Sequence, residues 1–529
     1  MSNKRLIKST GLIGFATFLS RVLGFARDVL TARLFGTTVF AETFVVAFRI
    51  PNLLRDLVGE GAANAAFVPV LTEYHTNHTE RDFWMLARDL LYALSLILIA
   101  ISALGILATP LMVKLIAPGF CEDPHKLALT ISLTRFIFPF VFLIGLVAYG
   151  TAILNSLNHF TAPALCPALL NIAMIFFLVY VCPKMGINGL AFSILVGGVF
   201  QVAAIWPVLH KKGLRLNFLN HRESATVVRR PSLTHPVIRK IWKLLVPRFF
   251  GSAVYQLSVI VDNIFSTFYW IVGAGAPAAL WYSYRLFHLP LAIFGIALAT
   301  AALPKMSQEV ARRDFSALKT TIRFSIKSIF FVLIPAGIGL ATLGKPAIRI
   351  LFERGEFTPY STSITYSALL FYSFGLFACG GIKILVNTFF SLGDTRTPVK
   401  TASISLIINI VLNYILMWPL KIGGLALATS ISATSNFLML YILLAKKIGD
   451  IGTPAILLSS VRIVAAGTVM GFFSYFAGIF LEGMDKGIIM NIIGLTFIIV
   501  LSAAVYVIAG AALGIEEIKA FLAWISRKN

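Results

Sequence analysis

The sequence predicts an all-α polytopic membrane protein with fourteen transmembrane helices, on the strength of three observations. Of the 529 residues, 58% are hydrophobic and only 13% are charged, a composition that excludes an ordinary soluble domain. Apolar runs of about 20 residues, the length that crosses a bilayer as a helix, recur along the whole chain. Short sequence matches also recur at one constant offset, which indicates an internal repeat.

The apolar runs, bounded by polar residues or by Gly and Pro, define the predicted helices. They cover residues 8–34, 40–72, 84–113, 128–155, 161–182, 187–210, 244–271, 277–302, 321–344, 361–391, 398–419, 423–445, 455–480 and 487–513. The second run is too long for one straight crossing and contains Pro51, so we expect a kink there. Basic residues gather in the loops on the side that holds both termini, and the positive-inside rule therefore places the N- and C-termini in the cytoplasm.

The repeat is visible in three short matches. Ser156-Leu157 matches Ser391-Leu392, Gly189-Leu190-Ala191 matches Gly424-Leu425-Ala426, and Pro69 matches Pro304, each at an offset of 235 residues. The common offset predicts two six-helix lobes related by a pseudo-two-fold axis along the membrane normal. The expected domains are an N-lobe at 1–210, a basic linker at 211–243, a C-lobe at 244–448, and two further helices with a cytoplasmic tail at 449–529. The linker is either a surface element on the anionic inner leaflet or an unstructured, positively charged loop.

The formal net charge of +23 belongs to membrane faces and helix interiors, because the chain is too apolar to present a solvated, nucleic-acid-binding patch. The four cysteines lack the spacing of a zinc site or a disulfide framework. The sequence motifs of P-loop, metalloprotease and serine-hydrolase chemistry are absent. We therefore expect a protein that is not an enzyme and that does not bind nucleic acid.

Ionisable residues inside the predicted helices are the most informative feature, because a charge in lipid is costly unless it faces water or a partner. The first two helices concentrate them, and the eighth adds two more. The candidate substrate-binding residues are Arg21, Arg27, Asp28, Glu42, Arg49, Asn52, Arg55, Glu60, Arg285 and His288. Arginine grips phosphate through a planar fork and stays charged when desolvated, so the set predicts a site for a diphosphate head group. Structural ion pairs and snorkelling side chains are the alternative interpretation, which we favour for Arg33 and Asp56.

A second polar group surrounds Asp262, a lone acid in the apolar seventh helix. Asn409 and Asn413 are spaced i and i+4 in the eleventh helix, and Thr429 lies in the twelfth. Their oxygens suit a monovalent cation, Na⁺ or H⁺, as a coupling ion. The same residues also suit an interhelical hydrogen-bond cluster. No other cofactor is implied.

Several short motifs of the N-terminal part are distinctive: Ser20-Arg-Val-Leu-Gly-Phe-Ala-Arg-Asp28, Pro51-Asn-Leu-Leu-Arg55, Glu60-Gly-Ala, Ala66-Phe-Val-Pro69 and Ala117-Pro-Gly-Phe120. They closely resemble motifs of the MurJ (MviN) family of lipid II flippases, which belongs to the multidrug/oligosaccharidyl-lipid/polysaccharide exporter superfamily. The resemblance extends over essentially the whole chain. It implies that the protein flips undecaprenyl-diphosphate-linked peptidoglycan precursor, lipid II, from the inner to the outer leaflet of the bacterial inner membrane by alternating access.

The resemblance also implies residue roles. The essential cavity arginines of the family fall on Arg21, Arg27, Arg55 and Arg285, and its acid in helix 1 falls on Asp28. The chain departs from the family where Glu42 replaces a frequent Asp, and where Tyr284 and His288 replace acids that some members carry, so the cavity becomes more positive. The two C-terminal helices resemble those that form the family's groove for the polyprenyl tail. Expected partners are lipid II, membrane lipids and other cell-wall synthesis proteins.

Other functions fit parts of the same pattern. An exporter of another polyprenyl-linked glycan would use the same arginines, whereas drug export predicts an acid-lined cavity. A membrane enzyme acting on polyprenyl phosphates needs acid clusters on cytoplasmic loops, which are basic here. A non-transporting scaffold for cell-wall synthesis also fits. For a flippase, about two negative charges moving outward gain roughly 2.3 kcal/mol per charge per 100 mV, so we expect the membrane potential to aid transport.

Overall fold

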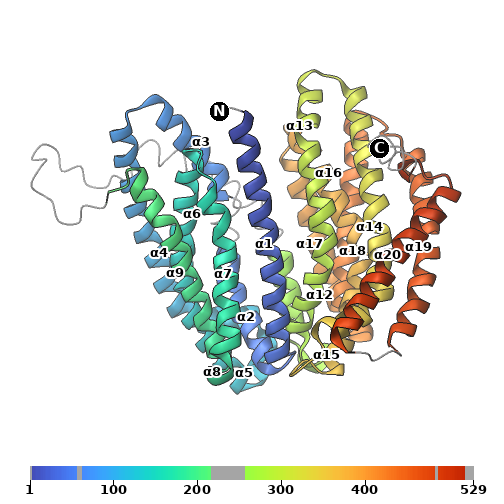
Figure 1. The fold of residues 1–529 in the computed structure, drawn as a ribbon, viewed down its shortest axis with the longest axis horizontal. Helices are drawn as coiled ribbons and strands as arrows, with labels where there is room; N and C mark the ends of the chain where they lie inside the picture. Colours follow the sequence, from blue (N-terminus) through green and yellow to red (C-terminus); the bar gives the residue numbers. More distant parts are fainter. Residues whose placement is uncertain (1–2, 56–61, 216–255, 483–486, 519–529) are drawn as a thin grey trace, which may run out of the picture. The chain divides into compact units, whose positions relative to one another are not determined.

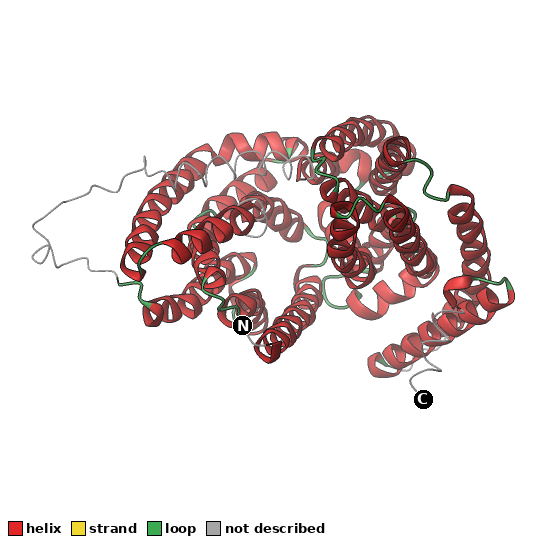
Figure 2. Cartoon of the chain, turned by 90° about the horizontal axis from the view of Figure 1, so that it is seen from above, coloured by secondary structure: helices red, strands yellow, loops and turns green. Residues whose placement is uncertain are grey.

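The structure, a computed structural model, describes residues 3–55, 62–215, 256–482 and 487–518. Within these ranges the chain forms helices and connecting loops, with no strand (Figures 1 and 2). It divides into two compact units. Unit 1 comprises Met1–Phe35 and Val39–Leu257, and unit 2 comprises Gly36–Thr38 and Ser258–Asn529.

Unit 1 is a helical bundle, drawn in blue and green in Figure 1. Its elements are α1 (Asn3–Phe35), α2 (Val39–Arg55), α3 (Ala62–Asn77), α4 (Glu80–Ile116), η2 (Pro118–Glu122), α5 (Pro124–Ile137), α6 (Phe140–Ser156), α7 (Thr161–Tyr180), α8 (Cys182–Met185) and α9 (Ile187–Lys212). α7 packs against both α1 and α9, while α2 packs against α5. These two sets of contacts position the charged residues of the first two helices.

Unit 2 begins with the helix of residues 256–266, most of which belongs to it. The elements that follow are α11 (Tyr269–Val272), α12 (Ala276–Pro290), η3 (Leu291–Ile296), α13 (Ala297–Ala311), α14 (Phe315–Phe352), α15 (Pro359–Ser373), α16 (Leu376–Ser391), α17 (Arg396–Leu420), α18 (Ile422–Ile448), α19 (Thr453–Glu482) and α20 (Ile488–Ala512). α17 packs along α18, and α14 packs along α19. The two C-terminal helices therefore attach to the rest of unit 2 mainly through α14.

The helix starts follow the offset that the sequence matches predict. Five pairs of helices begin 235 residues apart: α3 and α13, α4 and α14, α5 and α15, α7 and α17, and α9 and α18. The capping residues follow it too. Thr79 and Asp314 each accept a hydrogen bond from the first turn of α4 and α14, and Asp123 and Thr358 do so for α5 and α15. An N-cap fixes where a helix begins. The 235-residue offset therefore appears in the positions of the capping residues as well as in the apolar runs.

The start of α17 is organised by Asp394, whose carboxylate accepts from the backbone N–H groups of Arg396 and Thr397. Lys447 Nζ lies 2.6 Å from the same carboxylate. The lysine hydrogen bond, followed by the Thr397 backbone hydrogen bond, holds the pKa of Asp394 well below its usual range. The Asp394 carboxylate therefore stays charged across the physiological pH range.

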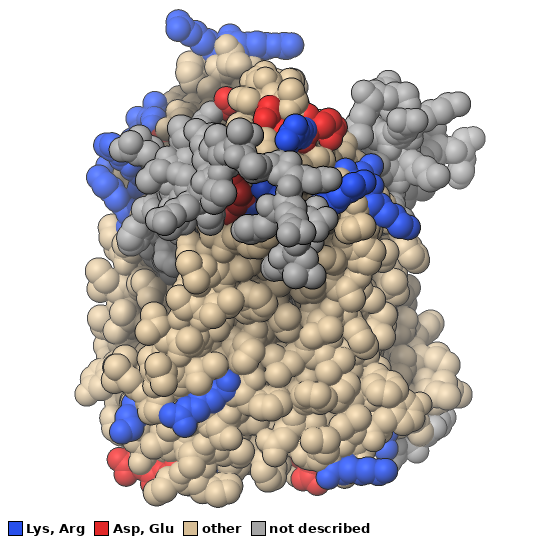
Figure 3. All heavy atoms as spheres, turned by 90° about the vertical axis from the view of Figure 1, so that its left-hand side faces the viewer, with Lys and Arg blue, Asp and Glu red and all other residues tan. Residues whose placement is uncertain are grey.

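The prediction of a polytopic membrane protein is confirmed. Among the described residues, ten helices are long and apolar enough to cross a membrane, or up to eleven if the bent pair α15–α16 forms one span. Figure 3 shows the matching surface on one side of the molecule, where charged side chains gather at two ends and a broad uncharged band separates them. α1 and α2, which carry most of the candidate binding residues, are not among the ten.

Three predicted helices are interrupted in the structure. The run at 128–155 breaks around Pro139 into α5 and α6, and the run at 361–391 bends by 46° between α15 and α16. The run at 277–302 contains a π-helical segment, η3, that begins directly after Pro290. At the first and third of these interruptions, proline has no N–H to donate to the preceding turn, so it locally releases the regular hydrogen-bond ladder. The run at 40–72 holds α2 and α3, and residues 56–61 between them lie outside the described residues, as do residues 216–243 of the predicted linker.

The turn between α1 and α2 belongs to unit 2 rather than to unit 1. Gly36 accepts a hydrogen bond from Tyr282 on its carbonyl oxygen at 3.2 Å, and Thr37 Oγ1 lies 2.7 Å from Ser361 Oγ. Gly36 has a φ of +52°, and a Cβ atom there would lie 2.1 Å from the Glu356 carbonyl oxygen. Only glycine fits this combination of backbone conformation and close approach.

Candidate functional site

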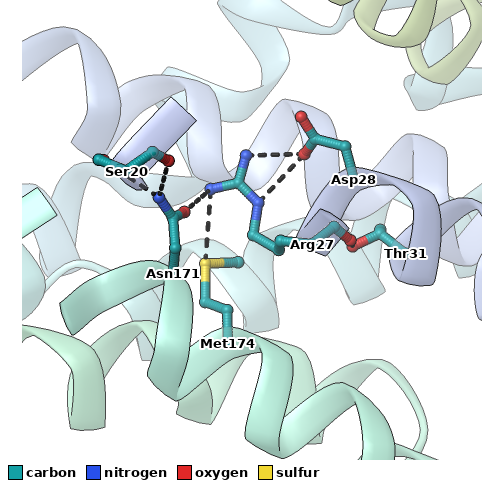
Figure 4. Close-up of polar contacts among 6 residues, drawn as sticks. All are labelled: Ser20, Arg27, Asp28, Thr31, Asn171 and Met174. Atoms are coloured by element: carbon teal, nitrogen blue, oxygen red, sulfur yellow. Dashed lines mark hydrogen bonds and ion pairs between the residues drawn. The ribbon is translucent and has the colours of Figure 1, made fainter. Parts of the chain in front are cut away.

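Arg27 on α1 has a largely buried guanidinium, whose side chain is 11% exposed. Its Nε and Nη2 atoms donate to Oδ1 of the neighbouring Asp28 at 3.1 and 2.7 Å (Figure 4). Asp28 is itself buried, with 5% of its side chain exposed. The structure thus brings together two of the predicted binding residues as a buried ion pair.

Asn171 on α7 completes this group, although the sequence did not single it out. Its Oδ1 accepts from Arg27 Nη1 at 2.9 Å, and its Nδ2 donates to the Ser20 carbonyl oxygen at 3.0 Å (Figure 4). Met174, one turn further along α7, places its sulfur 3.8 Å from Arg27 Nη1. The signal that could have marked Asn171 is its position as an amide inside the otherwise apolar run at 161–182.

Glu42 on α2 also lies in a buried ion pair. Lys126 on α5 places its Nζ 2.8 Å from Glu42 Oε2, and the side chains are 7% and 1% exposed. The same ammonium lies 5.6 Å from the centroid of the Phe120 ring. Lys126 lies in the first turn of α5, buried against α2.

The remaining candidates of the first two helices lie on the same elements. Arg21 is exposed on α1, and Arg49 and Asn52 are partly buried on α2. The side chain of Arg55 and the whole of Glu60 lie outside the described residues. The structure therefore joins Arg27 to Asp28 and joins Glu42 to a lysine 84 residues away.

In unit 2, Arg285 lies on α12 with its guanidinium carbon 4.4 Å from the centroid of the Trp281 ring. The two residues are spaced i and i+4, so they share a helix face. Such a stack contributes about 0.5–2 kcal/mol and uses the face of the guanidinium rather than its N–H edges. His288 packs edge-on against Tyr284 at a ring distance of 5.0 Å. The candidate arginine of this unit thus stacks on an aromatic ring of its own helix.

The four residues predicted to hold a cation lie together in unit 2. Asp262 accepts from Asn413 Nδ2 on Oδ1 and from Thr429 Oγ1 on Oδ2, both at 2.8 Å. Asn409 Oδ1 accepts from Asn413 at 3.2 Å, and Asn409 Nδ2 donates to Thr429 at 3.3 Å. Both asparagines are fully buried. Among the described residues, Asn413 Oδ1 has no hydrogen-bond partner. The cluster therefore contains one buried oxygen whose acceptor capacity is not used by these contacts.

Comparison with known proteins shows which family the chain resembles. The family described as "Lipid II flippase MurJ" matches residues 31–511. The "Probable lipid II flippase MurJ" of Vibrio cholerae is 36% identical over 453 residues, which cover 83% of each chain. The "Lipid II flippase MurJ" of Burkholderia cenocepacia is 32% identical over 496 residues, covering 93% of this chain and 94% of the relative.

Solved structures agree. A "Lipid II flippase MurJ, inward closed conformation" superposes with a TM-score of 0.76 at 27% identity, covering 95% of this chain and 98% of that one. An inward-facing multidrug resistance MATE transporter of the MOP superfamily superposes with a TM-score of 0.65 at 15% identity, covering 82% and 96%, and so shares the fold. The family is described as one of flippases, which confirms the expectation of a transporter and not an enzyme. The extent of the family match, the identity to its members and the shared fold show that this chain belongs to the MurJ family of lipid II flippases.

Proposed function

We propose that this protein flips undecaprenyl-diphosphate-linked peptidoglycan precursor, lipid II, from the inner to the outer leaflet of the bacterial inner membrane by alternating access. The observation that carries the proposal is the match to the flippase family across residues 31–511. In the proposed arrangement the chain crosses the membrane fourteen times and both termini are cytoplasmic. Two six-helix lobes, related by a pseudo-two-fold axis along the membrane normal, then alternate between inward-open and outward-open states.

The head group binds, in this proposal, to arginines of both lobes. Arg27 supports this role because its guanidinium is largely buried and Asp28 takes only its Nε–Nη2 edge, and arginine binds phosphate oxygens through paired N–H groups. Arg21, Arg49, Arg55 and Arg285 supply further positive charge, and Asn52 and His288 supply hydrogen bonds, while Asp28, Glu42 and Glu60 balance part of that charge. The polyprenyl tail stays in lipid along α19 and α20, whose outward faces carry exposed Phe472, Phe476 and Ile489. The membrane potential favours outward movement of the diphosphate.

Removal of either of two arginines tests the site. In cells that depend on this protein at normal expression, Arg27→Ala or Arg285→Ala is expected to lower flipping by about tenfold or more, because a charge partner of the diphosphate is lost. The measurement is the fraction of lipid II that reaches the outer leaflet. Arg33→Ala, at the exposed end of α1, is the matched control and is expected to leave flipping unchanged. Wild-type flipping in both Arg27→Ala and Arg285→Ala would refute the arginine site.

We also propose that the Asp262 cluster takes a monovalent cation, Na⁺ or H⁺, that couples to transport. The donor set fits a hard cation, because it offers a carboxylate, a hydroxyl and amide oxygens. The partnerless Asn413 Oδ1 supports the same proposal, since rotation of that amide would bring its oxygen toward Asp262 in place of its nitrogen. The hydrogen bonds now present hold the four side chains together when no cation is bound.

Asp262→Asn separates a cation site from a purely structural cluster. Binding of a ligand to the folded state stabilises it by RT ln(1 + [L]/Kd), so the melting temperature rises with the ligand concentration. Wild-type protein is therefore expected to melt higher in NaCl than in choline chloride, or to show a pH-dependent melting temperature if the ion is H⁺, and Asp262→Asn is expected to lose that dependence. Asp450→Asn, in an exposed loop, should retain it. A wild-type melting temperature that is insensitive to both Na⁺ and pH would refute the cation site.

A further inference from the structure

Asn171 bridges α1 and α7 with both ends of one amide. Its Nδ2 donates to the carbonyl oxygen of Ser20, and its Oδ1 accepts from the guanidinium of Arg27. Ser20 and Arg27 are seven residues apart, so they lie two turns apart on the same face of α1. The amide therefore connects the Ser20 carbonyl oxygen to the Arg27 guanidinium (Figure 4).

Gly24 makes room for this bridge. It lies midway between Ser20 and Arg27 on the same face of α1, and a Cβ atom at Gly24 would lie 3.4 Å from Asn171 Nδ2. The amide thus lies flat against the α1 backbone, where it is held on one side by Ser20 and on the other by Arg27. Asn171 itself is buried, at 7% exposure. A buried amide with both groups bonded has little freedom to turn.

The contacts of Arg27 define which edge of its guanidinium remains for a ligand. Of the five N–H groups, Nε–H and one Nη2–H point to Asp28, and one Nη1–H points to Asn171. The second Nη1–H meets the sulfur of Met174 at 3.8 Å, and a thioether is a weak acceptor. The end of the fork, with one N–H each from Nη1 and Nη2, is the edge that a stronger acceptor would take.

We propose that Asn171 is a positioning residue for substrate recognition. It fixes the plane of the Arg27 guanidinium from the side opposite Asp28, so that the end of the fork is presented to a phosphate of the incoming diphosphate. Asp28 alone holds one edge and leaves the side chain free to swing about that ion pair. This inference rests on the proposed function, because it assigns Asn171 a role in binding the same diphosphate.

A double-mutant cycle tests whether Asn171 acts through Arg27. The measurement is the dissociation constant of undecaprenyl diphosphate for the purified full-length protein in lipid nanodiscs. Asn171→Leu, which has the same branching and number of side-chain heavy atoms but no polar group, is expected to raise that constant about tenfold in the wild-type background and by less than about twofold in the Arg27→Ala background. Equal factors in the two backgrounds would overturn the proposal.

Asn387→Leu is the matched control for a general packing effect. Asn387 on α16 also bridges two helices, since its Nδ2 donates to the Ala299 carbonyl oxygen at 2.8 Å, but its amide does not contact an arginine in the described contacts. Both Leu variants are expected to lower the melting temperature, while only Asn171→Leu weakens binding. Equal weakening of binding by the two variants would show that Asn171 is merely structural.

Two outcomes separate this inference from the proposed function. No binding of undecaprenyl diphosphate by the wild type would refute the proposed function itself. Binding that is weakened by Arg27→Ala but unchanged by Asn171→Leu would refute the positioning role alone. Should Asn171→Leu yield too little folded protein, Asn171→Ser enters the same cycle, because its hydroxyl is too short to bridge Ser20 and Arg27, and it is expected to show the same loss of effect in the Arg27→Ala background.

Discussion

Lys126→Met is expected to lower the free energy of unfolding by about 3–5 kcal/mol, because it leaves the Glu42 carboxylate buried and without its ammonium partner. The two charged atoms are 2.8 Å apart, and 1% of the Glu42 side chain is exposed, so water cannot replace the lysine without a local rearrangement. The measurement is denaturant or thermal unfolding of the purified protein in detergent.

Two further variants serve as controls for the effect of burial on this ion pair. Glu42→Gln combined with Lys126→Met removes both charges, and a buried pair replaced as a whole costs far less than a broken one, so the double variant should be more stable than Lys126→Met alone. Lys447→Met breaks a pair with a similar separation of 2.6 Å, but 42% of the Lys447 side chain is exposed. Its expected cost is about 0–1 kcal/mol. Equal losses for Lys126→Met and Lys447→Met would contradict the argument from burial.

Gly36→Ala is expected to destabilise unit 2 by about 2–5 kcal/mol. A positive φ costs a non-glycine residue about 1–2 kcal/mol, and overpacking adds about 1–3 kcal/mol. The new Cβ would lie 2.1 Å from the Glu356 carbonyl oxygen, and a backbone atom cannot turn aside as a side chain can. We expect hydrogen exchange to rise around residues 353–361, where the turn docks.

Gly186→Ala provides the control for the backbone conformation alone. Gly186 has a φ of +59°, close to that of Gly36, but a Cβ atom there would have nothing within 4 Å. Only the conformational cost of about 1–3 kcal/mol is therefore expected. If the two alanine variants unfold at the same denaturant concentration, the close approach at Gly36 does not contribute to stability.

Much of the fold could be predicted because a lipid bilayer requires each membrane-spanning helix to be a long apolar run of similar length. The offset of 235 residues in three short matches reappears in the starts of five helix pairs. The breaks at Pro139 and at Phe374–Gly375 escaped prediction, because the hydropathy of these runs is continuous across them. At these breaks only the backbone hydrogen bonding is interrupted. A hydropathy average over a window of residues does not detect such an interruption.

The candidate site also contains residues that the sequence identified and residues that it did not. Charges such as Arg27, Asp28 and Asp262 could be singled out because each is unfavourable in lipid without a partner, and the Asp262 group proved to be one hydrogen-bonded cluster. Asn171 and Lys126 were not singled out, since what matters is their contact with α1 and α2 across 144 and 84 residues. A neutral amide carries no comparable penalty, and a lysine near a helix start resembles an interfacial anchor.

The π-helical segment η3 changes which residues share one side of the helix that carries Arg285. Each residue of an α-helix turns it by about 100°, and a π turn accommodates one additional residue. Everything after Ile296 is therefore rotated by about that angle relative to an uninterrupted helix. Met306, which contacts Thr388, and Glu309, which accepts from Thr321, depend on this angular phase. The additional residue thus changes the orientation of α13 relative to α12. α12, which carries Arg285, can then pack on α15, while α13 packs on α14 and α16.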